Sequence, residues 1–449
     1  MLTEVALLAI LLALAWNTLY NASIVFLAMD RSYVAKLGDV RSSITILVAA
    51  KNEPIEVLEA TTKNVVDALQ RSGVVGELLL VLDDDPKYVA QLLSRTPRDP
   101  RIVVVLRLNG VGRKCGALNL GYALARYENL LLLDADARID PRTLDRLARC
   151  RDVCIAPWRS YGVYGTWIEE TTRFLTDLGS WLYYLLRPRL GLYPYTLGSG
   201  TIVRKEVLEE VGGWRLDVVH DDIWLGSELA KRGYVPTIVD GWCYVSTPST
   251  LRAARIQLER WSFGALEIAT RFGKNILSAP LNALTKFEAY LYLLQAVQSL
   301  IAFLGFATCF PAVLFEPSRN LFEPPFLAMM GIAVALAVLN YIALKRFANS
   351  FEEPLYRKKL PFLMGRASAL SATLMPFLAI NALMGLLGKR ISFRITPKRY
   401  ERGLDVSIPI SASMYLALAI LAILFGNQPI ALVALCYLAA PIYVALRIR

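Results

Sequence analysis

The sequence predicts an α/β domain placed between a single membrane helix and a bundle of further membrane helices. Hydrophobic residues make up 55% of the 449 residues, which is too many for a soluble protein of this size. The apolar excess is concentrated in residues 4–29 and from about residue 288 to the end. The stretch between them has the composition of an ordinary soluble domain. We therefore expect a membrane anchor, a globular domain and a membrane bundle, in that order.

The globular part has the pattern of a parallel sheet whose strands alternate with helices. Short apolar runs rich in β-forming residues are separated by helical patterns, and they occupy residues 43–50, 78–82, 102–106 and 130–133. Two of these runs end in acidic clusters, at residues 83–85 and 134–136. Because ligands of such sheets bind beyond the carboxyl ends of the strands, we expect a binding site at these acids.

Four segments are expected along the chain, each with its own relation to the membrane. The first apolar run is too long for a removable signal peptide and has no small-residue cleavage site, so it is expected to be retained. Residues 250–275 have the pattern of an amphipathic helix at the membrane surface, and residues 172–190 resemble a second one. The expected segments are an N-terminal transmembrane helix (1–30), a cytosolic α/β domain (31–248), interfacial amphipathic helices (249–287) and a transmembrane bundle (288–449).

The charges of the bundle constrain its topology. The loops at 345–360 and 389–405 are strongly basic, so both are expected on the cytosolic side. The segment between them, 361–388, then cannot cross once. Its arginine, serines and Pro376 suit an interfacial or re-entrant helix pair. This predicts five crossings with the N-terminus outside, and the alternative of six crossings would put one basic loop outside.

The net charge of +11 does not indicate nucleic-acid binding. The basic residues cluster at the ends of apolar segments, where retained cytosolic loops carry them, and no basic stripe interleaved with aromatic residues follows a soluble element. The six cysteines show no metal-ligand spacing. Cys150 and Cys154 could share a helical face, but we expect reduced thiols in the core.

Asp134 and Asp136 form the acidic pair with the clearest chemistry. Two carboxylates two positions apart beyond a strand end can hold a divalent cation, which in turn binds a diphosphate. The alternative is a solvated loop or helix-capping pair. Asp83 and Asp84, which close another strand, are candidates either for contacts to the base and ribose of a nucleotide or for an Asx-turn.

Further polar residues lie at helix starts or on the predicted surface helix. Lys114 and Asn119, near the start of a helix with small residues, can hold phosphate or ribose hydroxyls. His220 is the only histidine of the chain and a candidate third metal ligand, with an ordinary hydrogen-bonded histidine as the alternative. Arg260 can pair with a diphosphate, and Trp261 can stack on a sugar ring or anchor the helix at the membrane.

Taken in order, eight motifs of this chain resemble those of family-2 glycosyltransferases of the cellulose synthase and hyaluronan synthase type. The resemblance extends over roughly residues 43–400 and includes the surrounding membrane topology. It implies a GT-A fold, which is a Rossmann-like domain with a mixed sheet, together with inverting transfer and a Mg or Mn cofactor. The motifs are N-E-P (52–54), D-D-D (83–85), G-R-K-C-G-A-L-N (112–119), D-A-D (134–136), G-S-G (198–200), H-D-D (220–222), Q-L-E-R-W (257–261) and F-R-I-T-P-K (393–398).

The resemblance also implies a role for each matching residue. The catalytic base would be Asp222, and the metal ligands would be Asp134 and Asp136. The nucleotide-sugar donor would be contacted by Asn52, Glu53, Asp83, Asp84, Lys114, Asn119, Asp134, Arg260, Thr396 and Lys398, the last two in a gating loop that closes over bound nucleotide. The acceptor would be framed by Gly198, Ser199, Asp221, Gln257 and Trp261.

Two positions depart from the family pattern. The family's T-E-D is His220-Asp221-Asp222 here, which keeps the base and changes its neighbours. Leu258 replaces the arginine that often follows the glutamine in polymer-making members. The second departure puts the polymerase interpretation in doubt without affecting the transfer chemistry.

These inferences predict a metal-dependent transfer of a sugar from a nucleotide-sugar to a lipid-linked acceptor or glycolipid at the cytosolic membrane face. We expect the sugar donor to be GDP-mannose in preference to a UDP-sugar. This expectation rests on what lipid-linked glycan assembly generally uses and not on any residue that would recognise the base. A processive synthase that translocates its product is the alternative, although five crossings leave room for a small channel at most. A transporter would need ionisable residues within its crossings, which are nearly free of them. An inactive nucleotide-sugar sensor would lack the metal acids or the base, and all are present.

Overall fold

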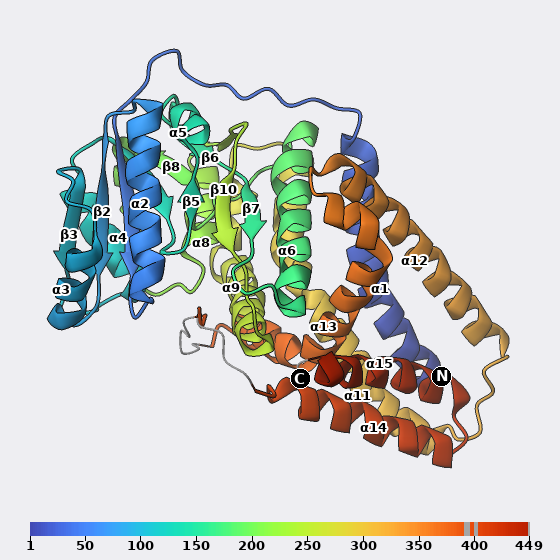
Figure 1. The fold of residues 1–449 in the computed structure, drawn as a ribbon. Coiled ribbons are helices and arrows are strands. Elements are labelled where there is room, and N and C mark those ends of the chain that lie inside the picture. The colour runs from blue at the N-terminus through green and yellow to red at the C-terminus, as the bar shows by residue number, and fades with distance from the viewer. Residues whose placement is uncertain (390–395, 399–402, 448–449) are drawn as a thin grey trace.

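The computed structural model describes residues 1–389, 396–398 and 403–447 and joins an α/β domain to a body of long helices (Figure 1). The larger sheet has the strand order β3-β2-β1-β4-β8-β6-β9. Strands β3 to β4 are parallel, and β8 runs antiparallel to both of its neighbours, so the sheet is mixed. The strands are β1 (Ile44–Ala50), β2 (Gly76–Leu82), β3 (Ile102–Leu106), β4 (Asn129–Leu133), β6 (Val153–Ile155), β8 (Thr201–Arg204) and β9 (Thr237–Ile238).

Helices cover both faces of this sheet, which explains why its central strands are continuous apolar runs. Every residue of β2 and β4 is buried. One face packs against α2, α3 and α5, and the other against α4, α7, α8 and part of α9. The helices are α2 (Ile55–Ser72), α3 (Pro86–Arg95), α4 (Arg113–Leu124), α5 (Pro141–Leu147), α7 (Lys205–Val211), α8 (Asp221–Lys231) and α9 (Leu251–Ser278).

A small second sheet stands beside the carboxyl ends of the main strands. Its order is β5-β10-β7, with β10 antiparallel to β5 and parallel to β7. The strand β7 is followed by α6, which continues through a π-helical and a 3-10 turn towards residue 190. The elements are β5 (Arg138–Ile139), β7 (Trp158–Tyr161), β10 (Cys243–Ser246), α6 (Trp167–Ser180), η1 (Trp181–Leu186) and η2 (Arg187–Leu190).

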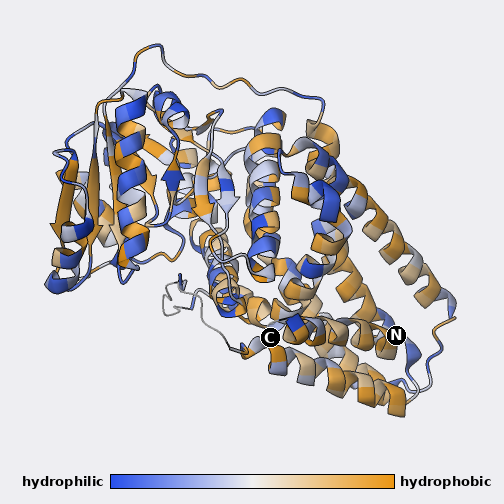
Figure 2. Ribbon diagram, viewed as in Figure 1, coloured by the Kyte–Doolittle hydropathy of each residue, from blue (hydrophilic) through white to orange (hydrophobic). Residues whose placement is uncertain are grey.

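Six helical stretches in the described part of the chain are long and apolar enough to cross a membrane, and they indicate an integral membrane protein. Figure 2 shows these helices as largely hydrophobic, in contrast to the mixed colouring of the α/β domain. They are α1 (Leu2–Ala28), the pair α10 (Ala283–Leu293) and α11 (Val297–Phe315) joined by η3 (Leu294–Ala296), α12 (Pro324–Ser350), α13 (Pro354–Leu386), α14 (Ser407–Leu424) and α15 (Gln428–Arg447).

Three features differ from the sequence-based expectation. The predicted helix pair at 361–388 is one helix, α13, with a kink at Lys359. The predicted surface helix α9 is not open to a membrane along its length, because α8 and α10 pack on one side of it and α13 on another. The expectation of reduced thiols is wrong for Cys150 and Cys154, which form a disulfide. The helix α5 ends before Cys150 and Cys154 lies in β6, so the turn between them brings their Cα atoms to 5.8 Å.

Candidate active site

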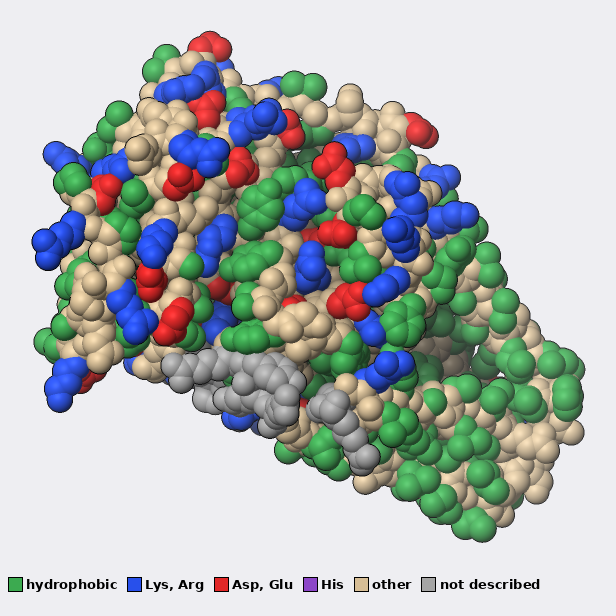
Figure 3. All heavy atoms as spheres, in the orientation of Figure 1, with side chains coloured by type: hydrophobic (Ala, Val, Ile, Leu, Met, Phe, Trp, Pro, Cys, Tyr) green, Lys and Arg blue, Asp and Glu red, His purple; other side chains and the backbone are tan. Residues whose placement is uncertain are grey.

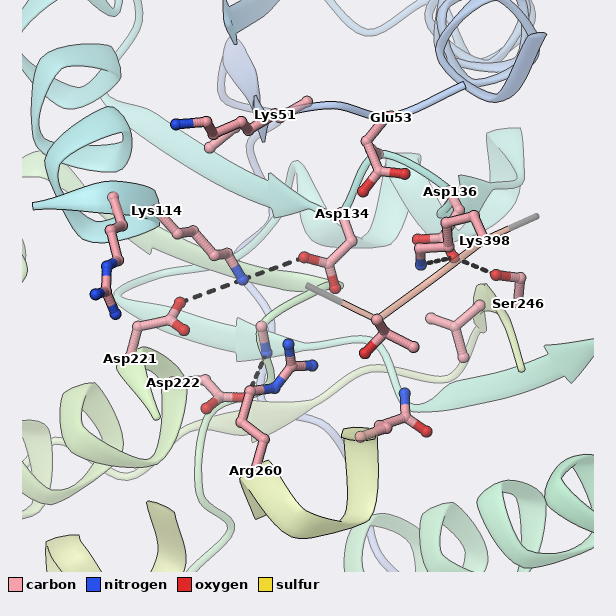
Figure 4. A pocket seen from close by; sticks show the side chains of 18 of the residues that line it. Lys51, Glu53, Lys114, Asp134, Asp136, Asp221, Asp222, Ser246, Arg260 and Lys398 are labelled. Atoms are coloured by element: carbon pink, nitrogen blue, oxygen red, sulfur yellow. Dashed lines mark hydrogen bonds and ion pairs between the residues drawn. The ribbon is translucent and has the colours of Figure 1, made fainter. Parts of the chain in front are cut away.

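A cleft of about 340 Å³ lies at the carboxyl ends of β1, β2 and β4 (Figure 4). Because these strands are parallel, the residues that follow them meet at one edge of the sheet. The starts of α4 and α8, the helix α9 and the segment 396–398 supply the other walls. Of the residues predicted from the sequence, those lining the cleft are Glu53, Asp83, Lys114, Asp134, Asp136, Gly198, His220, Asp221, Asp222, Gln257, Arg260, Trp261, Thr396 and Lys398.

Lys114 links the strand-end acid Asp134 to the start of α8. Its Nζ lies 3.1 Å from Asp134 Oδ1 and 3.3 Å from Asp221 Oδ2 (Figure 4). Burial alone would lower the pKa of Lys114, but the carboxylates of Asp134, Asp221 and Asp222 outweigh it and raise the pKa. Lys114 therefore stays charged at neutral pH, as a group that binds phosphate must.

Asp136 faces the segment 396–398 instead of Lys114. Its Oδ2 is paired with Lys398 Nζ and accepts a hydrogen bond from the Ser246 hydroxyl. Burial would raise the pKa of Asp136, but the charge of Lys398 and these hydrogen bonds lower it. The two acids of D-A-D thus each have a lysine partner, from different elements of the fold.

Glu53 is the least satisfied acid of the cleft. Its Oε2 is buried and has no hydrogen-bond partner within the described structure. Burial raises the pKa of Glu53 to about 7, and the nearby charges of Asp136 and Asp134 add to this against the opposing effect of Lys398. A cation bound near Glu53, Asp134 and Asp136 would favour the ionised form of Glu53.

The acidic residues fit a Mg or Mn ion that is shared with a substrate. Carboxylate oxygen is the donor that these ions prefer, and Mg²⁺ is usually held by one or two carboxylates together with substrate phosphates. Among the residues that the structure describes, no group of three His, Cys, Asp or Glu side chains forms a ready metal cage. His220 therefore does not complete a three-ligand cluster with Asp134 and Asp136, and its predicted role as third ligand is not supported.

Asp222 is held in place at the first turn of α8. Its Oδ2 accepts a hydrogen bond from the Gly198 N–H at 2.9 Å, and its Oδ1 accepts one from the Ile223 N–H at 2.8 Å. A Cβ on Gly198 would lie 3.3 Å from this carboxylate and 3.3 Å from Lys114 Nζ, so only glycine leaves both side chains undisturbed here. Each carboxylate oxygen keeps a second lone pair that can accept a proton.

His220 and the residues of α9 form the wall opposite the sheet. The His220 ring lies against Gly264, where a Cβ would approach its Cγ to 2.7 Å. Burial lowers the pKa of His220, and its buried Nδ1 has no partner within the part of the chain that is described. Arg260 extends into the cleft (Figure 4), and the Trp261 ring lies 6.4 Å from that of Trp158.

Four predicted site residues do not line the cleft. Ser199 lies directly below it, where its hydroxyl accepts from the Asp134 N–H at 3.2 Å. Asp84 accepts from the Asn52 N–H at 2.7 Å, and this bond holds the turn after β1. Asn119 exchanges two hydrogen bonds with the backbone of residue 214, each 2.7 Å long. These hydrogen bonds shape the backbone around the cleft.

Asp83 lines the cleft, but its carboxylate is engaged elsewhere. Arg107 donates to both of its oxygens, with Nε 2.5 Å from Oδ1. The same guanidinium donates to the carbonyls of Val111 at 2.5 Å and Arg113 at 2.7 Å. The buried ion pair thus fixes the loop that leads into Lys114. Of the predicted gating motif, Thr396 and Lys398 are at the cleft, whereas Phe393, Arg394 and Ile395 lie outside the described residues.

Several lining residues were not predicted from the sequence. Lys51 directly precedes the N-E-P motif and could have been found from its position at the end of β1. Arg113 begins α4 and could have been found in the same way. Trp158 and Ser246 come from the small sheet, whose short strands carry no recognisable motif, so no sequence signal would have placed them beside Asp136.

Comparisons with known proteins agree with this geometry. The model described as "Glycosyl transferase family 2" matches residues 45–212, and "Glycosyl transferase family group 2" matches residues 130–344. A "Probable glycosyltransferase" of Sulfolobus acidocaldarius is 25% identical over 366 residues, covering 79% of this chain and 77% of the relative. A beta-monoglucosyldiacylglycerol synthase of Nostoc sp. is 23% identical over 393 residues, covering 84% of this chain and 79% of the relative.

A solved structure shows the same fold. It is the mannosyltransferase PcManGT from Pyrobaculum calidifontis, in complex with GDP-Man and Mn²⁺, with a TM-score of 0.61 and 16% sequence identity. The match covers 87% of this chain and 100% of that one. The predicted combination of a GT-A domain with long apolar helices is confirmed. From the family models, the relatives and the fold together, the chain belongs to glycosyltransferase family 2 and is an enzyme that transfers sugars from nucleotide-sugar donors.

Proposed function

We propose that this enzyme transfers one sugar, with inversion, from GDP-mannose to a lipid-linked acceptor or glycolipid at the cytosolic face of a membrane. The observation that carries the proposal is the single cleft that joins the strand-end acids, the α8 acid Asp222 and the cations of α4, α9 and segment 396–398. The donor preference is supported by the shared fold of the Pyrobaculum mannosyltransferase, which was solved with GDP-Man. The lipid acceptor is supported by the similarity to a glucosyldiacylglycerol synthase.

Asp222 is the proposed general base. It accepts the proton of the acceptor hydroxyl, whose oxygen attacks the anomeric carbon while the bond from that carbon to the diphosphate oxygen breaks. One displacement of this kind inverts the configuration at the anomeric carbon. The two backbone N–H groups that hold the carboxylate keep it oriented without occupying all its lone pairs.

The cationic side chains of the cleft receive the leaving nucleoside diphosphate. Arg260 and Lys398 carry positive charge to the side of the cleft where the diphosphate would lie, and Lys114 adds a third charge. Asp134 and Asp136 would hold a Mg or Mn ion, which supplies further positive charge to the departing diphosphate. For Lys398 this requires an exchange of partners, since its pairing with Asp136 would give way to one with phosphate.

The arrangement of α13 supports five crossings and a cytosolic catalytic domain. Near its start, Glu353 lies 3.7 Å from Arg173 of α6, and near its end the Gly385 carbonyl accepts from Thr270 of α9 at 3.3 Å. Both partners belong to helices that adjoin the catalytic sheet (Figure 1). A helix whose two ends contact the same side of the molecule lies along the membrane face. On this basis α1, α11, α12, α14 and α15 cross, with the basic loops on the cytosolic side.

A processive polysaccharide synthase is the second candidate. It is supported by a relative of part of the chain, a poly-beta-1,6-N-acetyl-D-glucosamine synthase of Staphylococcus aureus, 25% identical over 241 residues. That match covers 52% of this chain and 57% of the relative, whereas the lipid-modifying relative is matched over most of both chains. We therefore favour the single transfer.

The experiment that tests the proposal is nucleotide release by the purified, reconstituted protein. A panel of GDP- and UDP-sugars is offered with and without membrane lipid extract and Mn²⁺. We expect release from GDP-mannose that depends on lipid extract, and a lipid-soluble product carrying one sugar. A water-soluble polymer made from a UDP-sugar would favour the synthase, and no release from any donor would refute both transfer proposals.

A further inference from the structure

A second, larger cavity lies among the membrane helices, away from the catalytic cleft. Its volume is about 850 Å³, within the range of about 300–1,000 Å³ that is typical of ligand pockets. The helices that line it are α1, α6, α11, α12, α13 and α15. Figure 3 shows a hollow where the apolar lower body of these helices meets the rest of the molecule. An opening in this region faces the surroundings of the spans, which in a membrane are lipid.

The lining is mainly apolar, with a charged group at one place. The side chains are chiefly leucine, alanine, phenylalanine and methionine, which suit hydrocarbon, and the polar minority includes the amides of Asn17, Asn21, Gln298 and Asn340. The charged lining residue is Arg366 of α13, which is 7% exposed. Polar groups inside a membrane body are costly, and they usually mark a ligand or a transport path.

Arg366 has unused hydrogen-bonding capacity. Its Nη1 is paired with Glu170 of α6, but its buried Nε has no acceptor in the described part of the chain. Glu170 is shared with Lys359, whose Nζ lies 3.1 Å from it, so two cations face one carboxylate. The guanidinium lies 4.0 Å from the Phe362 ring centroid, in surroundings where an unpaired N–H is expensive. This group of charges therefore favours an additional anion.

The charged end of the cavity is linked to the catalytic cleft through residues 161–167. Arg366 lies 5.9 Å from the ring centroid of Trp167, at the start of α6. The segment from the end of β7 to Trp167 contacts the cleft at two points. The Tyr161 hydroxyl donates to the Asp136 carbonyl at 2.6 Å, and the Tyr164 hydroxyl donates to the Lys398 carbonyl at 3.2 Å. A head group at Arg366 would thus lie near the start of α6, and the segment before α6 contacts the backbone of Asp136 and Lys398.

We propose that this cavity binds the hydrocarbon chain of a lipid phosphate, with Arg366 Nε donating to the phosphate. The inference rests on the proposed function, because it places a phosphate between the hydrocarbon chain of the lipid-linked acceptor and the hydroxyl that Asp222 deprotonates. Charge-assisted hydrogen bonds from arginine to phosphate are among the strong ones, and a chain that fills an apolar cavity adds affinity in proportion to the surface buried. A neutral diacylglycerol would leave the Nε unpartnered, so the proposed acceptor shares a lipid chain with the one named in the Nostoc relative but differs from it in the head group.

Two glycines provide a matched test of the cavity. A Cβ built on Gly365 or on Gly331 meets no atom within 4 Å, so a side chain can start from either position without a clash at its Cβ. Gly365 lines the cavity beside Arg366, whereas Gly331 of α12 does not line it. Gly365→Leu therefore fills the cavity, and Gly331→Leu makes the same change elsewhere on a membrane helix. Both replace a helical glycine with a better helix former.

The experiment measures lipid binding to the full-length protein in phosphatidylcholine nanodiscs. The probes are geranylgeranyl phosphate and geranylgeraniol, which share one chain and differ in the phosphate. We expect the phosphate to bind at least tenfold more tightly than the alcohol, and Arg366→Gln to remove this difference. Gly365→Leu should weaken the binding of both probes, whereas Gly331→Leu should weaken the binding of neither. The proposal would be overturned if Gly365→Leu bound both probes as tightly as the wild type does. It would also be overturned if Arg366→Gln bound the phosphate as tightly as the wild type does.

Two further measurements distinguish an acceptor site from a site for bulk lipid and from a loss of folding. If phosphatidylglycerol displaces geranylgeranyl phosphate at equal mole fraction, the cavity holds bulk bilayer lipid and the acceptor assignment is wrong. GDP binding shows that each variant is folded. If Arg366→Gln does not bind GDP, the comparison of Gly365→Leu with Gly331→Leu tests whether the lipid occupies the cavity. Transfer from a nucleotide-sugar is measured separately. If the wild type binds the lipid phosphate but no donor releases nucleotide, the proposed function fails and the binding site stands.

Discussion

Replacing Arg107 by methionine is expected to destabilise the catalytic domain strongly. Methionine keeps much of the apolar stem of Arg107 but removes the guanidinium that pairs with Asp83. Both side chains are almost fully buried, with 8% and 5% of their surfaces exposed. The substitution therefore leaves a carboxylate at the end of β2 without its counter-charge. It also removes the two hydrogen bonds to the loop carbonyls that precede α4.

The expected cost follows from burial of an unpaired charge. Removing one partner of a buried ion pair costs about 3–5 kcal/mol. For a domain of about 200 residues, 1 kcal/mol shifts the melting temperature by about 2–4 °C, which gives a drop of roughly 6–20 °C. The double variant Asp83→Asn with Arg107→Met buries no unpaired charge. The free energy of unfolding that the double variant loses should be clearly smaller than the sum of the losses in the two single variants.

The assay is thermal unfolding of the purified protein, followed by a double-mutant cycle. Arg71→Met serves as the control, because Arg71 and Asp67 form an ion pair that is 68% and 54% exposed, and it should cost less than about 1 kcal/mol. If Arg107→Met behaves like this control, or if the two single losses simply add, the buried pair does not have the role we give it.

Three further outcomes are expected. Gly264→Ala should lower kcat with little change in donor affinity, because its Cβ would displace the His220 ring. The control Gly331→Ala should change neither kcat nor donor affinity, and equal kinetics of the two variants would contradict this prediction. Burial would raise the pKa of Asp405, but the hydrogen bonds from Arg255 outweigh it, so the pKa is lowered. The ionised carboxylate therefore stabilises the fold above its unfolded pKa of about 4, and this stabilisation is lost as the pH falls further. Melting temperatures of Asp405→Asn and wild type should therefore converge below about pH 4, and a constant difference at all pH values would exclude the linkage. Chelation with EDTA should abolish transfer and Mn²⁺ should restore it, and undiminished transfer in EDTA would show that no divalent metal is needed.

The first four strands and the position of the cleft could be predicted because these strands are parallel and largely apolar. Buried strands of this kind are continuous apolar runs, and residues that follow them must meet at one edge. Asp134, Asp136 and Asp83 were located in this way from local sequence alone. The gating segment and α9 lie far along the chain from the strand-end acids. Their place in the same site could therefore be assigned only through the resemblance to a family.

What the sequence did not disclose depends on contacts between distant elements. Ser246 reaches Asp136 from a short strand of the small sheet, and no local pattern predicts that sheet. Asn119 was predicted to bind the donor, but a backbone partner 95 residues away takes both of its groups. The disulfide of Cys150 and Cys154 was missed because reduced thiols were expected in the core, and no local pattern shows that the chain turns between α5 and β6.

The role of Asp222 is tested most directly by comparing Asp222→Asn with the wild type in two measurements, sugar transfer and GDP binding. The amide keeps the size of the side chain and loses its basicity, so transfer should fall by about 10²–10⁴-fold while GDP still binds. Transfer at the wild-type rate by Asp222→Asn would contradict the account, since the acceptor proton would then have to leave by another route.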